Sequence, residues 1–220
     1  MLKYPCLVLD HDDTVVQSEA TVNYPCFCEY LKIYRPNAVY TLADYVSDCG
    51  KMSFVDLCRE RFHLTDEELL AEYHFWQNYS RSHIPAPFPG IKELLLAYRQ
   101  AGGKICVASM SSAETILRDY RVHFGFEPDM VFGCDLPAER RKPNPWLMDQ
   151  IMDIYGFSKE QLLVVDDMTL AIPMAQNAGC PIAFAAWGRL NYPEVYAEME
   201  RRCDFLFRTP KTLQDFLLEE

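Results

Sequence analysis

Three carboxylates lie within four residues near the start of the chain. In the segment LVLDHDDTVV (7–16), Asp10, Asp12 and Asp13 follow directly after an apolar run. Like charges at this spacing repel one another, and a buried carboxylate without a partner is costly. The cluster therefore indicates a bound cation. Clustered carboxylates without a histidine partner favour a hard cation such as Mg²⁺.

Other reactive side chains also stand where apolar runs end. Ser109 ends the run 104–109, and Asp166 and Asp167 end the run 161–167. Lys142, in RRKPNP, precedes the run that ends in the acidic pair. Ligands of parallel sheets bind beyond the carboxyl ends of the strands, so we expect these side chains to converge at one edge.

This combination of groups indicates phosphoryl transfer. A carboxylate nucleophile can form an aspartyl-phosphate. Phosphoryl transfer otherwise needs positioning and charge neutralisation, which a lysine, a hydroxyl and Mg²⁺ supply. A second carboxylate two residues further on could protonate the leaving oxygen.

Four segments also resemble a known family. DHDDT (10–14), VAS (107–109), RKPNP (141–145) and VVDD (164–167) resemble the four motifs of the haloacid dehalogenase-like hydrolases, in order and over nearly the whole chain. The resemblance implies that the protein is an enzyme of the phosphoglycolate phosphatase and β-phosphoglucomutase branch.

The resemblance also implies a role for each motif residue. Asp10 is the nucleophile, and Asp12 is the general acid and base whose backbone carbonyl also binds Mg²⁺. Ser109 and Lys142 bind the transferring phosphoryl group. Asp166 and Asp167 complete the metal site with Asp10 and Asp12, and the adjacent-acid form of the motif favours Asp167 over Asp166 as the direct ligand.

The motifs favour a phosphatase among the reactions of this family. The dehalogenases and the phosphonate-cleaving branch lack the acid at Asp12, whereas phosphatases and mutases retain it. PIAFAAWG (181–188) resembles phosphoglycolate phosphatases, and Ser53 stands near the place of an arginine that mutases keep. We therefore expect hydrolysis of a small organic phosphomonoester, either phosphoglycolate-like or a sugar phosphate. The alternatives are a phosphomutase and a phosphate-binding regulatory protein without turnover.

The remaining polar residues near the motifs have two interpretations each. Lys51 could contact the far end of the substrate, or it could be a solvated loop lysine. Strand alternation places His11 opposite the neighbouring acids, which favours packing or a supporting role over catalysis. Trp187 and Gly188 could line the entrance of the site, although filling the core is the more ordinary use of the tryptophan.

The periodicity of the chain predicts an α/β fold with a doubly wound parallel sheet. Helical patterns separate the short apolar runs, and Ser111-x-x-Glu114 predicts a capping box for a helix that stops at Gly125. The expected strands are the runs 6–10, 104–109, 129–133, 161–167, 181–188 and 204–208.

The interval 17–85 breaks this alternation. It contains four amphipathic helical stretches and no run that is apolar on both faces, and Thr65-x-x-Glu68 predicts a capping box for the last of them. We expect a small all-α cap domain at 17–85, inserted into a core domain of residues 1–16 and 86–220.

Composition limits the classes of partner. The 220 residues are 50% hydrophobic and carry a formal net charge of −11, which argues against binding to nucleic acid or to an anionic membrane. The apolar N-terminal run is too short for a signal peptide or a membrane span. Nine cysteines, an odd number, fit reduced thiols in the cytoplasm better than a disulfide framework. The expected partner is a small phosphorylated metabolite, and the oligomeric state is left open.

Overall fold

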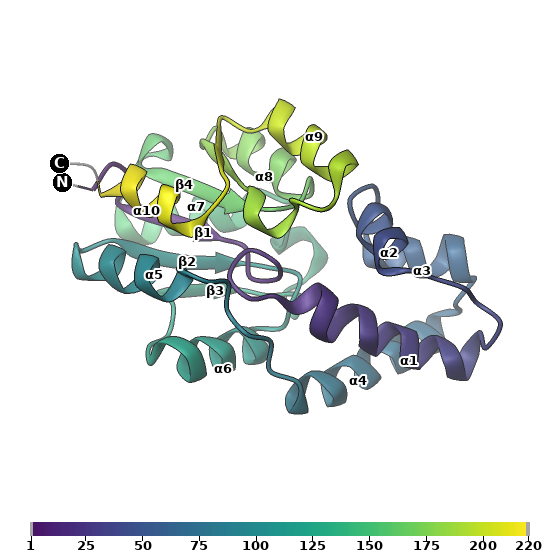
Figure 1. Ribbon diagram of the computed structural model, residues 1–220. Helices are drawn as coiled ribbons and strands as arrows, with labels where there is room; N and C mark the ends of the chain where they lie inside the picture. The colour runs from purple at the N-terminus through teal and green to yellow at the C-terminus, as the bar shows by residue number, and fades with distance from the viewer. Residues whose placement is uncertain (1, 219–220) are drawn as a thin grey trace. The chain divides into compact units, whose positions relative to one another are not determined.

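The computed structural model describes residues 2–218, which form two compact units. The core unit contains the residues up to Gln17 and those from Ala86 onward, and the helical unit is Ser18–Pro85. Figure 1 shows the elements of both.

The core unit is built on a six-stranded parallel sheet with the strand order β3-β2-β1-β4-β5-β6. β1, β2, β4 and β5 are apolar on both faces and almost entirely buried, as expected for central strands covered by helices on both sides. The predicted doubly wound α/β fold is therefore confirmed. The strands are β1 (Cys6–Leu9), β2 (Lys104–Ala108), β3 (Met130–Phe132), β4 (Leu162–Asp166), β5 (Ile182–Ala185) and β6 (Phe205–Phe207).

Helices cover both faces of this sheet. On one face, alternate strand residues such as Leu7 and Leu9 share a buried cluster with apolar residues of α5 (Ile91–Gln100), α6 (Ala113–Phe124) and α10 (Pro210–Leu217). Figure 1 shows α7 (Trp146–Tyr155) and α8 (Ala171–Ala178) on the other face. A ten-residue helix beyond β5, α9 (Pro193–Arg202), packs Tyr196 against Phe184 of β5.

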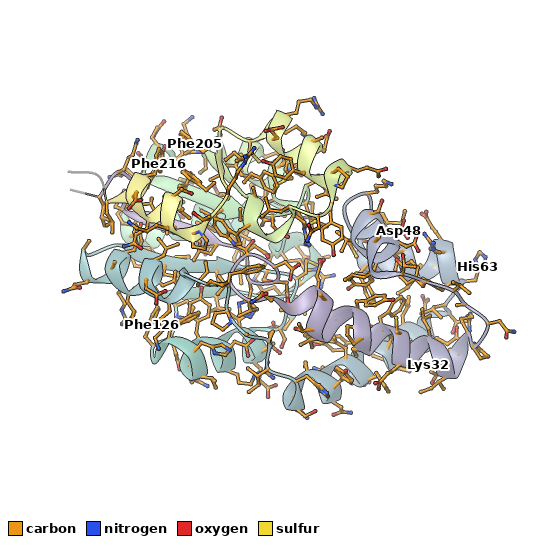
Figure 2. All side chains as sticks on the ribbon, viewed as in Figure 1. Lys32, Asp48, His63, Phe126, Phe205 and Phe216 are labelled. Atoms are coloured by element: carbon orange, nitrogen blue, oxygen red, sulfur yellow. The ribbon has the colours of Figure 1, made fainter. Side chains whose placement is uncertain are left out.

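Aromatic side chains close the β6 edge of the sheet. Phe205 of β6 and Phe216 of α10 lie side by side with ring centroids 4.9 Å apart (Figure 2), and Tyr4 contacts both. Rings in such tilted arrangements add stabilisation beyond the area they bury.

The helical unit contains α1 (Tyr24–Tyr34), α2 (Leu42–Cys49), α3 (Phe54–Phe62) and α4 (Asp66–Ser82). A π-helical turn, Glu19–Asn23, leads into α1. The core of the helical unit is aromatic, since Phe27 packs edge-on against Tyr40, Phe54 and Phe62. The predicted capping box at Thr65 and Glu68 is present.

The two chain segments that join the core unit to the insert are hydrogen-bonded to each other. The amide of Gln17 donates to the carbonyl of Ala86 at 2.9 Å, and the amide of Phe88 donates to the carbonyl of Val15 at 3.1 Å. The chain therefore leaves and re-enters the core unit at adjacent points.

One predicted helix start was displaced by a residue. The N-cap of α6 is Ser112, whose side chain accepts a hydrogen bond from the amide of Thr115, and the predicted cap Ser111 lies before it. The Ser111 hydroxyl donates to an acidic side chain instead, as described below. No helix within residues 2–218 is long and apolar enough to cross a membrane.

Candidate active site

The sheet topology brings the ends of β1 and β4 together. The chain runs from β1 outward to β2 and β3 and then crosses back to β4 on the other side of β1, so a switch of direction lies between β1 and β4. Leu9 pairs with Val165, and the amide of Asp10 donates to the Val165 carbonyl at 2.9 Å. Ligands of doubly wound folds bind at such a switch point.

Lys142 joins the acids that follow these two strands. Its Nζ donates to Oδ1 of Asp10 at 2.6 Å and to Oδ2 of Asp166 at 2.5 Å. All three side chains are at least 90% buried. The backbone amide of Met168 donates to the other oxygen of Asp166, which fixes that carboxylate from a second side.

Burial and crowding shift the protonation equilibria of this trio. The pKa of Asp10 is raised to about 7, chiefly by desolvation, with Lys142 opposing the rise and the neighbouring acids Asp166 and Asp12 adding to it. Burial lowers the pKa of Lys142, but the carboxylates of Asp10 and Asp166 outweigh it and raise that pKa above its ordinary value. The lysine is therefore a fixed positive charge beside Asp10.

The other acid of the pair, Asp167, has different partners. The Thr14 hydroxyl donates to its Oδ1 at 3.0 Å, and Arg189 contacts its Oδ2. Arg189 also donates from Nη1 to Oδ2 of Asp13 at 2.9 Å. The Arg189 side chain is fully buried, so it forms a second cationic centre beside the acids.

Asp12 is held by two serines. The Ser111 hydroxyl donates to its Oδ2 at 2.6 Å, and the Ser109 hydroxyl donates to the same oxygen at 3.3 Å. The amide of Ser111 in turn donates to Ser109 Oγ at 3.1 Å. Asp12 is only partly buried, whereas the other four acids of the site are buried.

His11 points away from these groups into the core. Its Nε2 lies 3.1 Å from Oδ2 of Asp119 on α6, both side chains are fully buried, and the imidazole stacks on Tyr120. This places it on the face that sequence alternation predicted. His11 therefore joins the loop after β1 to α6.

The acidic groups fit a divalent cation. Asp10, Asp166 and Asp167 each offer a carboxylate oxygen, and these oxygens lie within 4.8 Å of one another. Oxygen donors are those that Mg²⁺ prefers. At full ionisation, the five carboxylates of the site outnumber its two cations by three charges. They are Asp10, Asp12, Asp13, Asp166 and Asp167, against Lys142 and Arg189.

The sequence profile of the haloacid dehalogenase-like hydrolases matches residues 7–185, which include every residue of this site except Arg189. The chain belongs to this family. The predicted family and the predicted hydrolase are confirmed, and the enzyme is a member with an inserted helical unit between its first and second strands.

Curated relatives of this hydrolase carry phosphatase names. Pyrophosphatase PpaX of Halalkalibacterium halodurans is 24% identical over 186 residues, which are 82% of this chain and 83% of the relative. A phosphoglycolate phosphatase of Vibrio cholerae is 27% identical over 153 residues, which are 68% of this chain and 64% of the relative. The chain thus aligns with less than two thirds of the second protein.

Solved structures of the family share the fold. A hydrolase of this family from Deinococcus radiodurans, crystallised with bound phosphate and sodium, superposes with a TM-score of 0.75 at 17% identity. The match covers 100% of this chain and 97% of that one. This likeness supports the fold of the hydrolase.

The sequence identified most of the cluster but missed three supporting residues. Asp10, Asp12, Ser109, Lys142, Asp166 and Asp167 lie together as expected. Ser111, Thr14 and Arg189 were not assigned to the site. Thr14 lies within a motif and Ser111 close to one, which is a usable signal. Arg189 directly follows Trp187 and Gly188, which the sequence marked as candidates for the site entrance, but nothing in the sequence indicated that the arginine itself is buried.

Lys51 and Trp187 have definite places within their own units. Lys51 is exposed in the helical unit, where its Nζ donates to the Ser47 hydroxyl at 2.8 Å. Trp187 is buried in the core unit, and its indole N–H donates to the Thr14 carbonyl at 2.9 Å. The tryptophan is a core residue that also anchors the loop after β1.

Proposed function

We propose that this hydrolase is a Mg²⁺-dependent phosphatase that cleaves a small organic phosphomonoester through an aspartyl-phosphate on Asp10. The observation that carries the proposal is the buried Asp10–Lys142–Asp166 trio with a third carboxylate close enough to share a cation. The names of the relatives, a pyrophosphatase and a phosphoglycolate phosphatase, support hydrolysis at phosphorus over dehalogenation.

In the first half-reaction, an oxygen of Asp10 forms a bond to phosphorus while the ester P–O bond breaks. The proton that the departing alkoxide needs comes from the carboxyl group of Asp12. Lys142 stays positive throughout and offsets charge on Asp10 and on the phosphoryl oxygens. When bound by Asp10, Asp166 and Asp167, with the Asp12 carbonyl as a further ligand, Mg²⁺ supplies additional charge neutralisation.

In the second half-reaction, Asp12 accepts a proton from water as the water oxygen attacks phosphorus. The bond between phosphorus and Asp10 breaks, which releases inorganic phosphate and restores the carboxylate. A hydroxyl donates one hydrogen bond at a time. When Ser109 donates to a phosphoryl oxygen, Ser111 therefore remains as the donor that keeps Asp12 in place.

The helical unit is our candidate for the cap domain that selects the substrate, here a phosphoglycolate-like compound or a sugar phosphate. Its insertion between β1 and α5 supports this.

Lys51 is the candidate contact for the far end of the substrate. Lys51→Ala should raise KM with kcat little changed. The matched control is Lys32→Ala, an exposed lysine of α1 labelled in Figure 2. Equal KM values for the two variants would remove Lys51 from the proposal.

The test of the chemistry is phosphate release from a panel of phosphate compounds, with Mg²⁺ and with excess chelator. The panel contains phosphoglycolate, sugar phosphates, nucleotides, pyrophosphate and an aryl phosphate. Wild type is compared with Asp10→Asn and with Asp153→Asn, an exposed aspartate of α7. We expect turnover that requires Mg²⁺ and is lost only in Asp10→Asn. Turnover that survives in Asp10→Asn would contradict the proposal.

Two other outcomes identify the alternative functions. Turnover that appears only with a bisphosphate activator, and transfers phosphate between positions of a sugar, would indicate a phosphomutase. Metal binding without turnover on any compound would indicate a regulatory phosphate-binding protein. None of the nine cysteines, all of which lie within residues 2–218, forms a disulfide, which supports the proposed cytoplasmic location.

A further inference from the structure

Arg189 is a fully buried arginine that contacts two acids of the site. Its Nη1 donates to Oδ2 of Asp13 at 2.9 Å, and its Nη2 contacts Oδ2 of Asp167. The side chains of Arg189 and Asp167 are 0% and 1% exposed. A planar guanidinium holds its N–H donors in a rigid fork, so it sets the direction of the carboxylates that it contacts more strictly than a flexible lysine ammonium does.

The two oxygens of Asp167 are therefore fixed from two different segments. The Thr14 hydroxyl, from the loop after β1, holds Oδ1 at 3.0 Å, and Arg189, from the segment after β5, holds Oδ2. A carboxylate restrained at both oxygens cannot rotate about its last bond without breaking a contact. Its direction is set before any ligand arrives.

The backbone around Arg189 is pressed against the loop after β1. A Cβ on Gly188 would lie 2.1 Å from the carbonyl oxygen of Asp13, so only glycine permits this approach. The adjacent Trp187 donates its indole N–H to the Thr14 carbonyl at 2.9 Å. The Arg189 guanidinium also lies 5.8 Å from the ring centroid of Tyr192. Packing thus determines where the guanidinium sits.

We propose that Arg189 is a positioning residue that fixes Asp167 in the direction needed to bind the divalent cation, an inference that rests on the proposed metal-dependent function. The simpler role would be to neutralise Asp13, whose backbone is left-handed with φ 52°. The two roles predict opposite results. Loss of a pure counter-charge makes the site more negative and tightens cation binding, whereas loss of a positioning contact weakens it.

The experiment measures binding of Mn²⁺ alone to the full chain, from the electron paramagnetic resonance signal of the free ion. Arg189→Met removes the charge and keeps most of the volume. Groups that orient metal ligands typically contribute roughly 10–100-fold to metal affinity, so we expect the Mn²⁺ dissociation constant to rise at least tenfold. Tighter or unchanged binding in Arg189→Met would overturn the proposal.

Three further variants separate positioning from charge and from general stability. Thr14→Val removes the other contact to Asp167 without a change of charge and should also weaken Mn²⁺ binding. Arg189→Lys keeps the positive charge but loses the planar fork, so its Mn²⁺ affinity should lie between those of Arg189→Met and wild type. This variant also tests the proposal if Arg189→Met does not fold. Leu95→Ala, a buried core substitution in α5, should lower Tm and leave Mn²⁺ binding unchanged.

Asp13 provides the decisive control. If Arg189 served only to neutralise Asp13, the double variant Asp13→Asn with Arg189→Met would lack both charges and bind Mn²⁺ with wild-type affinity. Wild-type Mn²⁺ affinity in the double variant would therefore overturn the proposal. Absence of Mn²⁺ binding in wild type would overturn it as well. Because binding is measured without substrate, failure of wild type to hydrolyse any phosphate would count against the phosphatase proposal and leave the comparison of variants intact.

Discussion

Replacement of the proposed nucleophile by asparagine should abolish turnover and raise the stability of the metal-free protein at pH 8. Burial raises the pKa of Asp10 from 3.8 to about 7, so the folded protein holds a proton that the unfolded chain has already released. Between these two values the folded state binds more protons. The free energy of unfolding therefore falls as the pH rises through this interval.

The magnitude follows from the size of the shift. Three pKa units correspond to about 4 kcal/mol, which is the cost of keeping Asp10 ionised in the folded state above pH 7. Asparagine removes that cost and retains an oxygen that accepts from Lys142. The pKa of about 7 already includes the opposing effect of Lys142, so the loss of that charge-assisted contact is not subtracted again. We expect Asp10→Asn to raise the free energy of unfolding by up to about 4 kcal/mol at pH 8.

Removal of Lys142, the ion-pair partner of Asp10, should have the opposite effect on the free energy of unfolding. Lys142→Met leaves Asp10 and Asp166 buried beside each other without a cation, which costs about 3–5 kcal/mol. Both variants are expected to be inactive. Their stabilities at pH 8 should therefore lie on opposite sides of wild type.

The assay is urea unfolding followed by circular dichroism, with chelator present, at pH values from 5 to 8. Asp153→Asn is the control for loss of a carboxylate at an exposed position. The stabilisation in Asp10→Asn should grow with pH. A variant that is less stable than wild type at pH 8, or a difference that does not change with pH, would refute this account of the site.

Three further substitutions test other contacts. Ser111→Ala removes a hydrogen bond to Asp12, the proposed general acid. Hydrogen bonds to charged groups contribute about 1.5–3 kcal/mol. Ser111→Ala should lower kcat about tenfold or more at unchanged KM, whereas the neighbouring cap variant Ser112→Ala should lower stability by about 1 kcal/mol with kcat retained. Burial raises the pKa of Glu72, in the helical unit, to about 7. Glu72→Gln should therefore raise the free energy of unfolding by up to about 3 kcal/mol at pH 8 and hardly at pH 4.5, and a gain that does not depend on pH would contradict this. Gly188→Ala should lower Tm and kcat together through its clash with the neighbouring loop carbonyl, whereas Gly156→Ala, at φ 68° with open space around it, should cost about 1–2 kcal/mol and leave kcat unchanged.

The sequence predicted the parts of the site that depend on strand ends. Asp10 and Asp166 follow apolar runs that could be recognised as buried strands, and parallel strands place their carboxyl ends at the same edge. The sequence placed Lys142 near this edge because it precedes the run that ends in Asp166, and the resemblance to the family then gave its role. Its burial could not be predicted, because a lysine in a loop carries no local signal of burial. Its contacts with both acids follow from the fold.

The supporting contacts could not be predicted because they join segments far apart in the sequence. Arg189 lies 176 residues from Asp13, and its burial depends on a backbone approach that only the packed structure reveals. His11 pairs with Asp119, which lies 108 residues away. Ser111 had a competing local interpretation as a helix cap, and the tertiary contact with Asp12 proved to be its actual use.

The paired segments at the entry and exit of the helical unit have a consequence for evolution and engineering. Gln17 and Ala86 are already hydrogen-bonded neighbours, so a single point on the core unit carries the whole insert. A different module grafted between these two residues would leave every strand end and every acid of the core in the same chain order. Under the proposed division of roles, chimeras joined there would exchange the part that selects the substrate and keep the part that reacts, and natural recombination at this point would have the same freedom.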